Sequence, residues 1–145
     1  MKKIFTLAFI ALTLLATACG KNNNDNPSTP QNDAKKALIG TWKIESIVDE
    51  GEKVVLDECR KRSYISFTER ELIDTNFNKR TGECKENSNT FSYIISNNQL
   101  ILSETKEKTF TYTFLISENK LTLIHSEKDN MGKEIEIEKK IYVKK

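Results

Sequence analysis

The sequence predicts an all-β protein: a single small eight-stranded antiparallel up-and-down barrel that follows a signal peptide and a flexible linker. Three observations favour this fold. From Leu38 onward, apolar and polar side chains alternate with the period of two that is typical of a half-buried strand. Glycines and asparagines, which tolerate positive φ, separate the alternating runs. Both prolines, Pro27 and Pro30, precede these runs, so proline interrupts no strand.

The clearest strand is Thr109–Ile116, where four apolar side chains share one face and threonines lie on the other. Short sequential hairpins without crossover helices favour a barrel, because closure removes the strand edges that invite aggregation. A sandwich of two sheets is the alternative. By the same pattern, strands are predicted at 38–48, 62–68, 71–79, 90–96, 99–104, 108–117, 120–127 and 134–144.

The N-terminus has the organisation of a lipoprotein signal peptide. Lys2 and Lys3 precede an apolar run, Ile4 to Leu15, and Ala16-Thr17-Ala18 precede Cys19. The apolar run is too short to span ~30 Å of hydrocarbon, and small residues before a cysteine mark a cleavage site. We expect Cys19 to become the first mature residue and to carry a thioether lipid and acyl chains such as palmitate, which together anchor stably. An ordinary secreted protein cut nearby is the alternative.

The segment Gly20–Asp33 contains no apolar residue, so it is predicted to be a solvated tether. One helical turn over Ala34–Ala37 is expected to precede the barrel. The chain thus divides into a signal peptide (1–18), a lipidated cysteine with a disordered linker (19–33) and the barrel domain (34–145).

The charge balance of the chain gives no net positive potential of the kind that attracts nucleic acid. Lys2 and Lys3 account for the net charge of +2, so the chain after the signal peptide is formally neutral. Arg60-Lys61-Arg62 is the densest basic run, and we interpret it as a solvated turn, with a phosphate or anionic-lipid contact as the alternative.

Two cysteines, Cys59 and Cys84, remain once Cys19 is lipidated. In an exported compartment they are expected to form a disulfide bond. A metal pair or a catalytic thiol is the alternative, but the chain has one histidine and therefore lacks further ligands or a convincing base.

Gly40-Thr41-Trp42 at the start of the first strand resembles the Gly-x-Trp that opens the barrel of lipocalins. With the cysteine pair, Tyr64–Phe67 and the later alternating strands, the pattern is similar to small lipocalin-like lipoproteins of bacterial envelopes over 38–145. This resemblance implies that Trp42 plugs the closed end under a basic residue of the last strand, either Lys139 or Lys144. Alternation places Lys139 inward, unless a β-bulge turns it outward.

An eight-stranded barrel is just wide enough to be filled by side chains or to hold one small ligand, and both interpretations stay open. The inward-facing set predicted by alternation is Trp42, Ile44, Val48, Ile65, Phe67, Ile73, Phe77, Phe91, Tyr93, Leu100, Leu102, Phe110, Tyr112, Phe114, Leu121 and Leu123. His125 is in phase with this set, as a ligand contact or as a rim residue with satisfied nitrogens. The candidate ligand-binding residues are Trp42, Phe67, Phe77, Tyr93, Tyr112, Phe114 and His125.

We therefore expect a non-enzymatic, membrane-anchored protein that binds a small hydrophobic ligand in the cell envelope. No cofactor, metal or nucleic acid is expected, and no nucleophile with a base is found. The alternative is a protein-interaction or inhibitor module of an envelope complex, with a packed interior and loops 79–90 and 127–133 presented to a partner. The resemblance implies the outer membrane as the location.

Overall fold

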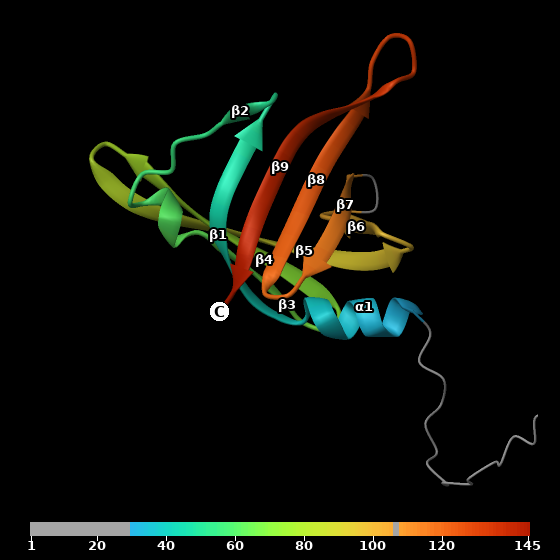
Figure 1. The fold of residues 1–145 in the computed structure, drawn as a ribbon. Helices are drawn as coiled ribbons and strands as arrows, with labels where there is room; N and C mark the ends of the chain where they lie inside the picture. The colour runs from blue at the N-terminus through green and yellow to red at the C-terminus, as the bar shows by residue number, and fades with distance from the viewer. Residues whose placement is uncertain (1–29, 106–107) are drawn as a thin grey trace, which may run out of the picture.

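The computed structural model describes residues 30–105 and 108–145, which form a closed antiparallel barrel of eight strands (Figure 1). Consecutive barrel strands are neighbours, and the last pairs with the first, so the barrel rather than the sandwich is confirmed. A two-residue strand, β2, extends the sheet beside β1. The strands are β1 (Gly40–Asp49), β2 (Glu52–Lys53), β3 (Tyr64–Phe67), β4 (Glu71–Arg80), β5 (Glu83–Ser96), β6 (Gln99–Ser103), β7 (Thr109–Ser117), β8 (Lys120–Lys128) and β9 (Glu134–Lys144).

The predicted strand boundaries agree with the structure to within two residues, except at β5, which begins at Glu83 instead of 90. Residues 83–90 are all exposed and their apolar and polar side chains do not alternate, so the sequence pattern predicted no strand over 83–89. Backbone pairing with β4 continues nevertheless, from Glu71 opposite Ser92 to Arg80 opposite Glu83. The paired strands extend beyond the barrel as an arm, at the left of Figure 1.

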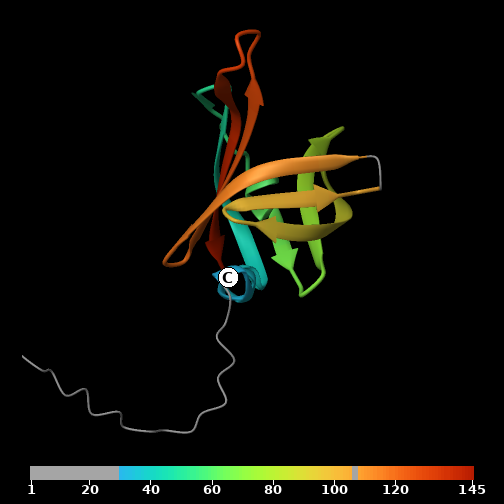
Figure 2. The ribbon, with the colours of Figure 1, turned by 90° about the vertical axis from the view of Figure 1, so that its right-hand side faces the viewer.

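Helix α1 (Pro30–Leu38) covers the lower end of the barrel (Figures 1 and 2). It begins four residues before the single turn expected from the sequence, and Pro30 suits its first turn because the first helical N–H groups have no intrahelical partner. Ala34 and Leu38 pack against the core. The predicted signal peptide, Cys19 and most of the predicted linker lie outside the described residues. None of the helices in the described part of the chain has the length and apolar character to cross a membrane.

A β-bulge in β1 changes which side chains face inward. The register shifts between Ile44 and Ser46, so Ile47 joins the buried core where alternation predicted Val48. In β9, Tyr142 is buried opposite Ile44 and Leu121, which places the even-numbered residues inward. The inward placement of Lys139 is therefore wrong.

The inward phase predicted for β4 is also wrong. Leu72 belongs to the core, opposite Phe67 and Phe91, whereas Ile73 and Phe77 lie on the outer face. The apolar residues of β4 fall on both faces, so the alternation of this strand does not define its inner face.

Cys59 and Cys84 form the expected disulfide bond, with Cα atoms 5.6 Å apart. Cys59 immediately precedes the 3₁₀ helix η1 (Arg60–Arg62), and Cys84 lies near the start of β5. The bond therefore ties the connection between β1 and β3 to the projecting arm.

Within residues 30–105 and 108–145, the core runs from Leu38 in α1 to Tyr142 in β9 and includes four side chains with no exposed surface: Leu38, Trp42, Leu100 and Leu121. Because every barrel strand is paired on both sides by strands of this segment, we expect residues 30–145 to fold on their own.

Candidate ligand-binding site

Trp42 plugs the lower end of the barrel. Its side chain is fully buried, and its Nε1–H donates to the carbonyl oxygen of Leu38 at 2.7 Å. Nζ of Lys144 lies 4.9 Å from the Trp42 ring centroid and donates to the Ala37 carbonyl oxygen at 3.2 Å. Lys144, and not Lys139, is therefore the basic residue over the tryptophan.

Three further predicted site residues are packed side chains of the core. Phe67 and Tyr93 meet edge to face, with centroids 5.4 Å apart, and both are buried, as is Phe114. The Tyr93 hydroxyl donates to the Thr68 carbonyl oxygen at 2.7 Å, and burial raises its pKa. Trp42, Phe67, Tyr93 and Phe114 thus belong to the core, and any ligand contact would require space that packing currently occupies.

Tyr112 and His125 lie together nearer the open end, with ring centroids 5.5 Å apart and both side chains partly exposed. Nδ1 of His125 lies 3.2 Å from the Thr111 carbonyl oxygen, and Nε2 lies 3.6 Å from Glu127. The structure therefore brings these two predicted residues together at a position that solvent reaches.

The upper interior also contains charges that alternation did not predict. Asp74, Asn76, Lys140 and Tyr142 line a cavity of about 40 Å³. Lys140 forms an ion pair with Glu138 at 2.8 Å. A polar cavity of this size has room for a water molecule and is far smaller than a typical ligand pocket.

Burial raises the pKa of the Asp74 carboxyl above its usual value of 3.8, although the Asn76 side chain donates to Oδ1 at 2.9 Å and Lys140 also favours the ionised form. The folded state then binds the proton more tightly than the unfolded state. Asp74 therefore costs stability as the pH rises from about 3.8 through its folded pKa.

We expect Asp74→Asn to remove this cost. The free energy of unfolding of the variant, relative to the parent, should increase as the pH rises from 3 to 7, because only the parent must ionise a buried group. Urea unfolding of both proteins across this range measures the difference. A difference that stays constant with pH would contradict the assignment.

Phe77 is the predicted site residue that the structure places outside the barrel. The Arg62 guanidinium lies 4.5 Å from its ring centroid. Lys43, Tyr64 and Lys145 line the same surface cavity, of about 290 Å³. Its predicted position in a barrel calyx is therefore wrong, since the inward residues of β4 are the even-numbered ones.

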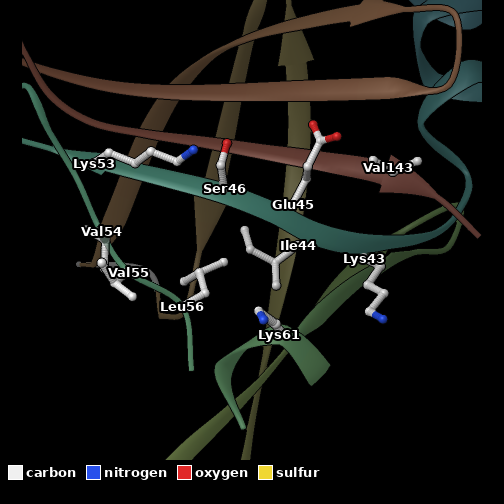
Figure 3. A pocket seen from close by; sticks show the side chains of 10 residues that line it. All are labelled: Lys43, Ile44, Glu45, Ser46, Lys53, Val54, Val55, Leu56, Lys61 and Val143. Atoms are coloured by element: carbon white, nitrogen blue, oxygen red, sulfur yellow. The ribbon is translucent and has the colours of Figure 1, made fainter. Parts of the chain in front are cut away.

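A larger concavity lies against β1, beside the segment that connects β2 to η1 (Figure 3). It has a volume of about 680 Å³, and we call it the outer pocket. Its lining is Lys43, Ile44, Glu45, Ser46, Lys53, Val54, Val55, Leu56, Lys61 and Val143. In Figure 3, Ile44, Leu56 and Lys61 lie on the same side of β1.

The outer pocket forms where β1 separates from β3. The two strands pair from Gly40 to Lys43, and beyond that point the chain between β2 and η1 stands beside β1 instead. The Val54 N–H donates to the Ile47 carbonyl oxygen at 2.9 Å, which fixes one end of this segment. Val55 is 91% exposed, although it is a large apolar side chain.

Sequence reasoning missed this pocket. Val54-Val55-Leu56 is an apolar run between predicted strands, and outward-facing Val143 adds a further apolar side chain from β9. No group of three or more histidine, cysteine, aspartate or glutamate residues within 30–105 and 108–145 is placed to hold a metal ion.

The barrel with its tryptophan plug defines a small antiparallel up-and-down β-barrel protein. The model of the lipocalin-like domain family matches residues 38–123, more than half of the chain, and the chain belongs to this family. No curated protein sequence gives a significant match.

Two solved structures are similar in fold. Odorant binding protein OBP1 has 14% identity and a TM-score of 0.46, over 77% of this chain and 73% of that one. Aphrodisin, described as a sex pheromone from female hamster, has 16% identity and a TM-score of 0.42, over 74% of this chain and 75% of that one.

Proposed function

We propose that this protein is a non-enzymatic lipocalin-like binding protein of the bacterial cell envelope, and that it takes one small hydrophobic molecule in the outer pocket. The observation that carries the proposal is the pocket itself. Its volume of about 680 Å³ falls within the roughly 300–1,000 Å³ of small-molecule sites, and five of its lining residues are aliphatic.

The lipid anchor is proposed from the sequence around Cys19, with the outer membrane as its location. Pro30, where the described chain begins, lies at the closed end of the barrel (Figure 1). A tether joined there lets the open end of the barrel point away from the lipid surface.

A neutral hydrophobic dye, N-phenyl-1-naphthylamine, tests the proposal on residues 30–145. We expect Val55→Asp to weaken dye binding by about tenfold, because the ligand would have to lie against an unpaired carboxylate. Leu115→Asp is the matched control, since Leu115 is also exposed but lies on the outer face of β7, outside this pocket. Fluorescence titration gives both affinities.

Equal dye binding by Val55→Asp and the control would remove the outer pocket from the proposal. The ligand-binding roles of Trp42, Phe67, Tyr93, Tyr112, Phe114 and His125 stay predictions, and Tyr112→Ala would then test the barrel mouth. If the parent protein bound no dye at all, the protein-interaction module would become the leading function. One observation favours that second candidate: Met131, in the connection between β8 and β9, is 89% exposed. This connection projects at the top of Figure 1.

A further inference from the structure

Cationic side chains adjoin the outer pocket. Lys43 lines both this pocket and the smaller cavity that contains Arg62 and Lys145. We call Lys43, Arg62 and Lys145 the cationic cluster. Because Lys43 lines both cavities, the two cavities adjoin each other, and a molecule bound in the outer pocket can contact the cationic cluster.

The acidic groups beside Arg62 are engaged with other partners: Glu58 pairs with Lys61, and Asp57 Oδ1 accepts from the Arg60 N–H. In the segments 30–105 and 108–145, neither Lys43 nor Arg62 takes part in an ion pair. Glu45 is the carboxylate that lines the outer pocket, and both of its oxygens accept from Lys120, at 3.0 and 2.9 Å. The region therefore remains positive in a domain whose formal net charge is zero.

Aromatic rings hold two of these cations. Arg62 lies over the buried ring of Phe77 at 4.5 Å, and Lys145 lies over Tyr64 at 5.5 Å. Stacking restricts the plane of a guanidinium while its N–H groups stay directed outward along that plane. These N–H groups match the two oxygens of a carboxylate or phosphate.

We propose that the ligand of the outer pocket is an anionic amphiphile, with its aliphatic tail against Ile44, Leu56 and Val143 and its carboxylate or phosphate head at Lys43 and Arg62. This inference rests on the proposed function and adds the chemical class of the ligand. It also gives Phe77 a role, which is to position Arg62 for the head group.

Competition against the neutral dye on residues 30–145 tests the inference. Decanoate and decanol share one tail and differ in the charge of the head, and acetate supplies the head without the tail. We expect decanoate to compete about tenfold better than decanol at low salt, and acetate not to compete at the same concentrations.

The double variant Lys43→Gln, Arg62→Gln is expected to remove the preference for decanoate while leaving decanol competition within about twofold. The control, Lys36→Gln with Lys128→Gln, changes the net charge equally at exposed positions outside both cavities. Lys43→Gln alone, which leaves the Arg62–Phe77 contact intact, should reduce the preference in part and guards against loss of folding in the double variant.

Equal competition by decanoate and decanol in the parent would overturn the inference while the proposed function stands, because the dye would still be displaced. Equal loss of preference in the control variant would overturn it as well, since net charge alone would then explain the effect. Competition by acetate as strong as that by decanoate would also overturn it, because the site would then bind the anionic head group without any contribution from the aliphatic tail. Failure of the parent to bind the dye would instead defeat the proposed function.

Discussion

Trp42→Ala is expected to lower the free energy of unfolding by about 3–5 kcal/mol. The side chain has no exposed surface, so its removal leaves a cavity at the closed end of the barrel. The substitution also removes the hydrogen bond to the Leu38 carbonyl oxygen and the ring beneath Lys144. Urea unfolding of residues 30–145, followed by circular dichroism, measures the loss.

Two control variants separate these contributions. Trp42→Phe keeps a ring but loses the Nε1–H donor, so an intermediate loss is expected. Lys144→Met removes the cation over the ring and should cost about 0.5–1 kcal/mol. A loss below about 1 kcal/mol for Trp42→Ala would mean that the plug is not part of the stabilising core.

The double variant Cys59→Ser, Cys84→Ser is expected to lose about 3.5 kcal/mol, because the bond closes a loop between residues separated by 25 positions. The expected loss comes mainly from the larger conformational freedom of the unfolded chain. Urea unfolding of the variant and of the parent under non-reducing conditions gives the value.

The same bond fixes the end of the segment that borders the outer pocket, since Cys59 follows Leu56 by three residues. We therefore expect the double variant, assayed at a urea concentration where it remains folded, to bind the neutral dye more weakly. Addition of dithiothreitol to the parent should reproduce both effects. A stable reduced protein with unchanged dye affinity would contradict the role given to the bond.

The alternation of apolar and polar residues predicted the strands well, because most residues that pair in the sheet also have one face buried in the core. In β7, Phe110, Tyr112 and Phe114 fall on the inner face as expected. In β4 and β9 the apolar residues are divided between the two faces of the strand. The alternating pattern then does not show which face points into the barrel. The buried positions of Leu72 and Tyr142 depend on their pairing partners in neighbouring strands, and one partner of Tyr142 is Ile44, at the other end of the barrel sequence.

The candidate site was less accessible to sequence reasoning. A basic residue over Trp42, either Lys139 or Lys144, followed from the resemblance, and the structure shows that it is Lys144. The disulfide followed from the cysteine count. The outer pocket depends on where β1 stops pairing with β3 after Lys43 and on the bulge at Glu45. Neither feature has a local sequence signal, so the run Val54–Leu56 alone gave no reason to place a pocket there.

The most direct test of the central claim is amide NMR of residues 30–145 titrated with decanoate. The account predicts chemical shift changes concentrated at Ile44, Val55, Leu56 and Val143, which line the outer pocket. Changes concentrated at Tyr112, Phe114 and His125 would place the ligand inside the barrel and contradict the account, as would a spectrum that decanoate leaves unchanged.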